Sequence, residues 1–281
     1  MKIFRYLALA IIPMTFIACD NFDEDEYMTL QGEDVQESTP ITVTQSSQAI
    51  LLEDYTGWKC TNCPEAAAIL NDLQKKYGNQ LVAMSVHAGS FARPSSINNN
   101  LDLRTEYGER WNTQFGLTQY PIGVINRVNN GTTKGFQKDA WDSEITSLLS
   151  SVTHRMNINL GAEVKDSYIL VSANYNALTN IDFQTLTNVV VVENGIVGVQ
   201  FNNNEQYGAV PEIDDYVFNH VLRTNGQVDT PLANNFSAGE SVNQNYKITI
   251  DPNWVIDNCI IIVFVTNAVT GEVIQTNEIE L

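Results

Sequence analysis

Hydrophobic and polar positions divide this chain into three regions with different patterns. Residues 7–18 form a continuous apolar run, residues 49–153 combine short apolar runs with helical spacing, and residues 154–281 contain many short apolar or alternating stretches. Helical spacing between apolar runs is typical of an α/β domain, whereas short stretches separated by turns are typical of an all-β domain. The pattern therefore predicts an α/β domain over residues 48–153 and an all-β domain over residues 154–281.

The α/β region opens with a strand, a helix and a second strand. Residues 49–55 form an apolar run, residues 60–77 place apolar side chains on one helical face, and residues 81–87 form the next run. Two strands joined by one helix usually pair in parallel. The first half of this domain is therefore predicted to be a βαβ unit.

The second half of the α/β region predicts a helix, a hairpin and another helix. Residues 103–115 carry Leu, Tyr, Trp and Phe at every fourth position, which is the spacing of a buried helical face. An Asn-Gly pair at 130–131 favours a hairpin between strands 122–126 and 132–136. Apolar spacing over residues 139–152 predicts the last helix.

The all-β region predicts an antiparallel sandwich. Alternation of apolar and polar residues at 171–175 and 246–250 gives these strands one buried face. About seven short strands with turns between them suggest an immunoglobulin-like arrangement. Residues 202–244 are irregular, and no strand is assigned there before residue 242. The predicted strands cover residues 156–164, 168–177, 187–192, 196–201, 242–250, 259–266 and 272–279.

The N-terminal run has the features of a secretion signal. Lys2 and Arg5 precede it, and its length is too short to span a bilayer core of about 30 Å. The run ends in Ala18-Cys19, which resembles the lipobox of bacterial lipoproteins. Residues 1–18 are therefore predicted to be a lipoprotein signal peptide, with Cys19 lipidated at the mature N-terminus. The alternative is ordinary secretion with an incidental cysteine.

An acidic segment follows the lipidation site. Between Asp20 and Ser38 there are eight acidic residues and no basic one. Such a composition does not bury a core, so residues 19–47 are predicted to be a disordered tether, with an edge strand as the alternative for residues 39–47. Acidic residues directly after the lipidated cysteine also resemble the surface-export signal of Bacteroidetes lipoproteins. We therefore expect an outer membrane lipoprotein on the cell surface, with a plain spacer and a periplasm-facing location as the alternatives.

The overall charge argues against one class of partner. The 281 residues include 15 basic and 33 acidic side chains. Binding to nucleic acid requires a basic face, so no nucleic-acid partner is expected. The expected partners are the membrane, through the lipid anchor, and either protein thiols and disulfides or an extracellular ligand.

A Cys-x-x-Cys motif, Cys60 and Cys63, follows the first strand at the predicted start of a helix. The positive end of a helix dipole stabilises a thiolate and lowers the thiol pKa. Cys60 lies nearer the helix start and beside Lys59, which makes it the expected nucleophile and Cys63 the resolving thiol. No second cysteine pair or close His-x-x-His pair accompanies the motif, so neither a metal nor a cofactor is expected.

Three features of the first domain together resemble the thioredoxin-like fold. Cys60 and Cys63 match its Cys-x-x-Cys, Pro121 matches the cis-proline that faces the disulfide, and Asp54 lies six residues before Cys60, where many members carry a buried acid. The resemblance implies that Asp54 accepts a proton through water and that the backbone at Pro121 pairs with an extended substrate.

Three further residues are candidates for the edge of the site. Trp58 is expected to form an apolar lip, and Lys59 lies beside the first cysteine. His87, at the end of the second strand, either approaches the disulfide and tunes Cys60 or is a packed residue of the following loop.

The mature chain as a whole is similar to the outer membrane protein 28-related lipoproteins of the Bacteroidetes. The similarity lies in Glu53–Gly57 leading into Cys60–Pro64, in Asn219–Arg223, and in Val263–Val265 followed by Glu272–Gln275. It implies a surface-associated lipoprotein with both predicted domains. It implies no defined biochemical activity.

Two functions remain open at this point. One is a tethered thiol–disulfide oxidoreductase that acts on exported proteins. The other is a surface binding or adhesion lipoprotein in which Cys60 and Cys63 form a structural disulfide. An exposed sulfur beside a cis-proline favours the enzyme, whereas burial of both sulfurs counts against turnover.

Overall fold

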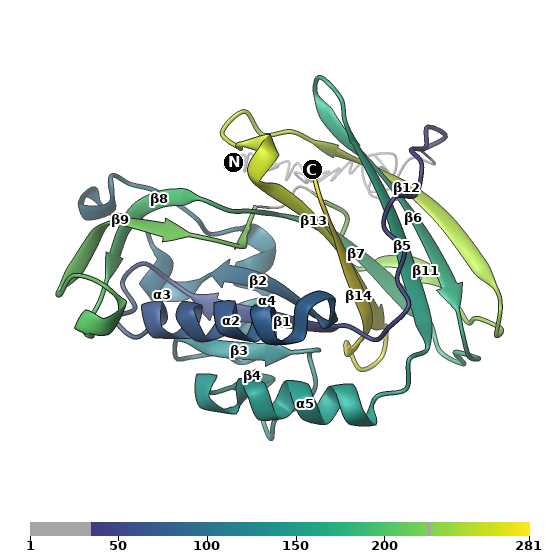
Figure 1. The fold of residues 1–281 in the computed structure, drawn as a ribbon, viewed down its shortest axis with the longest axis horizontal. Coiled ribbons are helices and arrows are strands. Elements are labelled where there is room, and N and C mark those ends of the chain that lie inside the picture. The colour runs from purple at the N-terminus through teal and green to yellow at the C-terminus, as the bar shows by residue number, and fades with distance from the viewer. Residues whose placement is uncertain (1–34, 224–225) are drawn as a thin grey trace, which may run out of the picture. The chain divides into compact units, whose positions relative to one another are not determined.

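The computed structural model of this protein describes residues 35–223 and 226–281 (Figure 1). The predicted signal peptide, Cys19 and residues 19–34 of the predicted tether lie outside the described residues. Residues 39–47, predicted to be either the end of the tether or an edge strand, contact the rest of the protein through their backbone. The backbone of Val43 forms a bridge with Leu160, because Gly161 has no side chain to keep Pro40 away.

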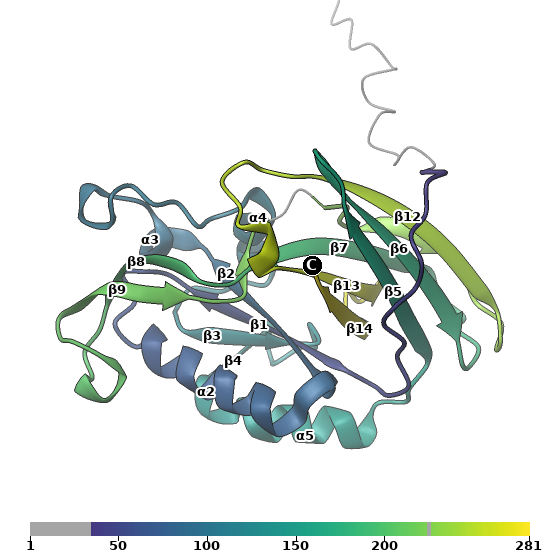
Figure 2. The same ribbon diagram turned by 45° about the horizontal axis from the view of Figure 1, so that its top comes forward.

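The α/β half has the predicted order of elements. Strand β1 pairs in parallel with β2 and antiparallel with β3, which pairs with β4. Helices α2 and α5 cover one face of these strands, and α4 covers the other (Figures 1 and 2). The elements are β1 (Ile50–Thr56), α2 (Cys63–Tyr77), β2 (Leu81–His87), α3 (Gly89–Ala92), α4 (Glu106–Gln114), β3 (Ile122–Ile125), β4 (Gly135–Phe136) and α5 (Trp141–Ser151).

Alternation along β1 explains why helices cover both of its faces. Ile50 and Leu52 pack with α2 and α5, whereas Leu51 and Tyr55 pack with the aromatic stripe of α4. In that stripe, Trp111 and Phe115 are buried as predicted. A strand that is buried on both faces is typical of a sheet covered by helices on each side.

The C-terminal half consists of two packed layers of strands. One layer is the three-stranded sheet β12-β6-β5, and the other contains β14, β13, β7 and β11. Their inward-facing side chains form one apolar core. The strands of this half are β5 (Met156–Val164), β6 (Tyr168–Ala177), β7 (Thr185–Glu193), β8 (Ile196–Phe201), β9 (Glu212–Phe218), β10 (Val221–Leu222), β11 (Thr230–Ala233), β12 (Ser241–Thr249), β13 (Cys259–Asn267) and β14 (Val273–Glu280).

The second layer continues into the α/β half. Strand β10 pairs with β7 on one side and with β2 on the other, which gives the order β14-β13-β7-β10-β2-β1-β3-β4 in one mixed sheet. The described residues, 35–223 and 226–281, belong to one compact unit. The protein is therefore mostly β, with a few helices and one large mixed sheet, and the division at residues 153 and 154 stays a prediction.

One predicted sandwich strand lies elsewhere. Residues 196–201 form β8 as expected, but β8 pairs with β9 in a separate two-stranded sheet. In Figures 1 and 2 this hairpin extends away from the sandwich, on the side of the α/β half. Strands β9, β10 and β11 all fall between residues 202 and 242, where the sequence predicted none.

Gln275 connects the two halves at the start of β1. Its buried side chain accepts a hydrogen bond from the backbone N–H of Ala49 (3.0 Å) and donates to the carbonyls of Ser47 (3.2 Å) and Met156 (2.9 Å). We expect Gln275→Leu to lower the free energy of unfolding by about 2–3 kcal/mol, because it leaves buried backbone groups without partners. Urea unfolding measures this. The exposed Gln114→Leu should change stability by less than about 0.5 kcal/mol, and an equal effect of both would contradict the assignment.

Among the described residues, no helix has both the length and the apolar character needed to cross a membrane.

Candidate functional site

Cys60 and Cys63 form a disulfide at the end of the turn that follows β1. The backbone N–H of Cys60 donates to the carbonyl of Gly57 (2.9 Å), and that of Cys63 donates to the carbonyl of Cys60 (3.2 Å). Helix α2 begins at Cys63 rather than at the predicted Cys60, because these hydrogen bonds close a turn first. Pro64 lies in the first turn of α2, where its missing N–H costs no hydrogen bond.

Asp54 is buried on β1, behind the disulfide. Its Oδ1 has no hydrogen-bond partner among the described residues. Burial raises the pKa of Asp54 to about 7. Asp54 and Cys63 both line a cavity of about 30 Å³, which has room for a water molecule. The structure thus brings together the acid and the second cysteine.

His87 lines the same cavity from the end of β2. It is buried, and neither ring nitrogen has a hydrogen-bond partner among the described residues. Burial, with a smaller contribution from the positive charge of Arg223, lowers the pKa of His87 to about 3. Its ring packs against Phe218 at a centroid distance of 5.3 Å. His87 therefore lines the cavity as an uncharged imidazole at physiological pH.

Pro121 follows a cis peptide bond from Tyr120, as its position predicted. It lies on a different hollow from Asp54 and His87. This second hollow is a cleft of about 340 Å³ between the start of α2 and the loop before β3, and its lining is mostly polar. The lining residues are Asn62, Glu65, Gln119, Tyr120, Pro121, Gln137, Lys138 and Asp139.

Trp58 is not the exposed lip that the sequence predicted. Its side chain is buried, its indole Nε1 donates to the carbonyl of Arg93 (2.9 Å), and its ring packs edge-on against Phe201 at 5.1 Å. Strand β8 supplies Phe201 and thereby covers the indole. Lys59 places its Nζ 4.8 Å from the centre of the Trp58 ring.

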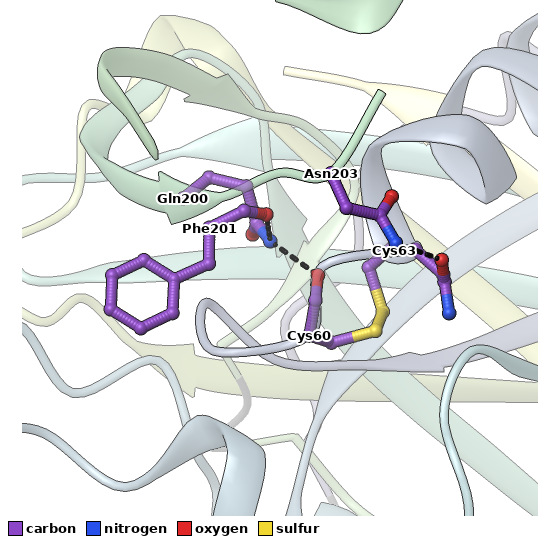
Figure 3. Close-up of a disulfide and its surroundings, with 6 residues drawn as sticks. Cys60, Cys63, Gln200, Phe201 and Asn203 are labelled. Atoms are coloured by element: carbon purple, nitrogen blue, oxygen red, sulfur yellow. Dashed lines mark hydrogen bonds between the residues drawn. A yellow bond between two sulfur atoms is a disulfide. The ribbon is translucent and has the colours of Figure 1, made fainter. Parts of the chain in front are cut away.

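Sequence reasoning missed three residues that hold the disulfide turn (Figure 3). Nε2 of Gln200 donates to the carbonyl of Cys60 (2.8 Å), and the backbone N–H of Phe201 donates to the carbonyl of Trp58 (2.8 Å). Nδ2 of Asn203 donates to Oδ1 of Asn62 (2.9 Å). These residues lie about 140 positions after the disulfide turn, and no local sequence pattern indicates that they contact it.

Both cysteines are buried. Cys60 is 3% exposed and Cys63 is 2% exposed. Residues 200–203 of β8 and the segment after it hold the backbone of the turn, and Gln200 lines the same cavity as Cys63. In this conformation neither Cys60 nor Cys63 is open to a large substrate.

The comparisons identify a family and related folds. The family profile "Outer membrane protein Omp28" matches residues 109–281. HBP35 of Porphyromonas gingivalis has a TM-score of 0.61 and 16% identity, with 84% of this chain and 76% of HBP35 covered. A protein from Agrobacterium tumefaciens has a TM-score of 0.50 and 11% identity, with 84% of this chain and 96% of that chain covered. At these identities the likeness shows the fold alone.

A further solved structure is a domain of the outer membrane lipoprotein Omp28 from Porphyromonas gingivalis. It has 21% identity and a TM-score of 0.31, with 47% of this chain and 92% of that domain covered. No curated protein matches the sequence.

Proposed function

This chain belongs to the outer membrane protein Omp28 family, and from this membership we propose a lipoprotein whose Cys60–Cys63 disulfide exchanges with thiols of exported proteins. The family match confirms the predicted location at the outer membrane. That match begins at residue 109, so the exchange activity is argued from the geometry of the site. The proposal treats residues 48–153 as a thioredoxin-like domain.

The lipid anchor on Cys19 is part of the same proposal. A small residue before a cysteine at the end of an apolar run is the arrangement that lipoprotein processing needs. A Cys19→Ser protein should leave the membrane fraction, and its retention there would contradict the anchor.

One observation supports exchange above all others: Asp54 is buried and unpaired in the cavity that Cys63 also lines. Burying a carboxyl without a partner lowers stability, and a structural disulfide has no need of it. A pKa of about 7 lets the same carboxyl give or take a proton near neutral pH. Perturbed carboxyls beside a reactive group are typical of catalytic sites.

The proposed reaction begins with a substrate dithiol. One substrate thiolate attacks Sγ of Cys60, the Cys60–Cys63 bond breaks, and Cys63 leaves as a thiolate. Asp54 supplies a proton to Cys63 through a water molecule in the cavity. The second substrate thiolate then attacks the substrate sulfur bound to Cys60, which releases Cys60. Two electrons pass from the substrate to the pair, the substrate becomes a disulfide, and a further disulfide must reoxidise the pair.

A second candidate is the surface binding lipoprotein with a structural disulfide. The burial of both cysteines, at 3% and 2% exposed, favours it. A cell-surface location also favours it, whereas a periplasm-facing location suits the oxidoreductase.

The reduction potential of the pair separates these two candidates. We expect a value of roughly −120 to −270 mV, the range of known exchange catalysts, when the full-length protein in detergent is equilibrated with thiol buffers. The buried thiol of Cys259, whose pKa burial raises to about 12, should stay unlabelled and serve as an internal reference. A value below about −300 mV would identify a structural disulfide.

A further inference from the structure

The β8–β9 hairpin is a separate element inserted between β7 and β10 of the large sheet. Among the described strands, β8 and β9 pair only with each other. At the base, the N–H of Gly195 donates to Oδ1 of Asn219 (3.0 Å), and the N–H of His220 donates to Oδ1 of Asn194 (2.8 Å). Gly195 and His220 both have positive φ values, 78° and 56°. The chain therefore turns sharply at both ends of the hairpin.

The hairpin contacts the disulfide turn at the end of β8. Residues 200–203 form hydrogen bonds with Trp58, Cys60, Thr61 and Asn62. The Gln200 side chain is buried, and its amide nitrogen also donates to the carbonyl of Phe201 (2.9 Å). The Gln200 side chain thus connects β8 to Cys60 by a hydrogen bond.

The rest of the interface is apolar, and Ile196, Phe201 and Tyr216 of the hairpin pack in one cluster with Trp58, Leu101 and Leu103. Phe218 packs on His87, and Phe201 packs on Trp58. Tyr216 lines the cavity that Asp54 and Cys63 share. The outer side of the hairpin is open to solvent, since the paired residues Val197 and Val217 are both exposed. Opening of the hairpin therefore has to separate these apolar contacts and the hydrogen bonds of residues 200–203.

Thiol–disulfide exchange requires that a substrate thiolate reach the disulfide, and the closed hairpin prevents this. An attacking thiolate must reach Sγ of Cys60, yet Cys60 is buried in the turn that the hairpin holds. We propose that the β8–β9 hairpin is a lid over the Cys60–Cys63 disulfide and that Gln200 is the positioning residue that keeps it closed. Its role in catalysis rests on the proposed function, whereas its control of access to the disulfide does not.

The rate of reduction of the folded protein tests this lid. Full-length protein in detergent is treated with dithiothreitol, and the new thiols are alkylated and counted by mass. We expect Gln200→Leu to be reduced at least tenfold faster than the wild type. Gln200→Glu should behave in the same way, because a carboxylate does not donate to the carbonyl of Cys60. Gln206→Leu, an exposed change between β8 and β9, should keep the wild-type rate.

Amide hydrogen exchange distinguishes lid opening from general loss of stability. In Gln200→Leu, the N–H of Phe201, which donates to Trp58, should exchange faster. The N–H of Val191, in the centre of β7, should exchange as in the wild type. Equal acceleration at both amides, or reduction rates that do not differ between Gln200→Leu and wild type, would overturn the lid.

Failure of the lid and failure of the proposed function give different results. Faster reduction of Gln200→Leu together with a reduction potential of the pair below about −300 mV would support the lid, but as a cover for a structural disulfide. A potential in the catalytic range together with unchanged reduction rates leaves the exchange activity standing and removes the lid.

Discussion

Replacing Asp54 by asparagine should stabilise the protein at neutral pH by up to about 4 kcal/mol while slowing thiol–disulfide exchange about 10²-fold. The stabilisation arises because asparagine carries no charge to bury, whereas Asp54 ionises in a buried cavity. The slower exchange arises because asparagine has no proton to transfer to Cys63. Denaturant unfolding and single-turnover oxidation of a dithiol peptide measure the two effects.

The pH dependence of this gain has a definite sign. In the unfolded chain Asp54 loses its proton near pH 3.8, but burial raises the pKa of Asp54 in the folded protein to about 7. Between these values the folded state binds more protons than the unfolded state, so the contribution of Asp54 to stability falls as pH rises. Asparagine does not titrate. The difference between Asp54→Asn and wild type should therefore be small near pH 4, grow up to about pH 7, and stay constant above it.

The difference between the two proteins isolates Asp54 from other buried groups. His87, whose pKa burial lowers to about 3, contributes stability that rises with pH over part of the same window, but it is present in both proteins.

Glu278→Gln on β14 is the matched control, because burial and the neighbouring Glu280 raise the pKa of Glu278 to about 7 as well. It should gain stability without slower exchange. A stability gain that is independent of pH, or equal exchange rates in Asp54→Asn and wild type, would contradict the assigned role.

Breaking the buried ion pair between Arg127 and Glu53 should lower the free energy of unfolding by about 3–5 kcal/mol. Nε and Nη2 of Arg127 donate to the two carboxylate oxygens of Glu53 at 2.9 and 2.8 Å. The guanidinium also stacks on Trp111, 4.3 Å from the ring centre. Burial alone would lower the pKa of Arg127, but the Glu53 carboxylate raises it, so the guanidinium stays protonated. Arg127→Met and Glu53→Gln each leave one buried group without its ionic partner.

The double variant Glu53→Leu/Arg127→Met tests this reason for the loss. It removes both charges together and should recover most of the stability that either single change removes. Lys75→Met breaks an exposed pair with Asp72 and should leave the denaturation midpoint unchanged. Additive losses in the double variant would show that packing, rather than the unpaired charge, determines the effect.

The sequence predicted those elements whose pattern depends on local burial. Strands β5 and β6 begin and end where the alternation of apolar residues does, at residues 156–164 and 168–177. The start of α2 was placed three residues too early, because the turn through Cys60 is closed by backbone hydrogen bonds that leave no apolar pattern. Residues 39–47 carry no core pattern, so the sequence alone leaves open whether they form an edge strand or the end of the tether. Their order comes from backbone pairing with β5.

The chemistry of the candidate site was also readable from the sequence in part. The spacing of Asp54, Cys60 and Cys63 is set within one strand and one turn, so it is a local property. The cis peptide before Pro121 agrees with its position before β3. The inward position of Trp58 was not predictable, because the residue that covers it, Phe201, belongs to a different half of the chain.

By itself the sequence determined the disulfide motif, the acid behind it, most strands and the family of outer membrane proteins, since these depend on neighbouring residues or on long patterns. Only the tertiary structure decided that β8 leaves the sandwich and places Gln200 on the carbonyl of Cys60. The sequence pattern of a strand does not depend on which sheet the strand joins. Alternation indicates that one face is buried, but not which part of the protein packs on that face. The accessibility of the disulfide is therefore set by contacts between residues about 140 positions apart.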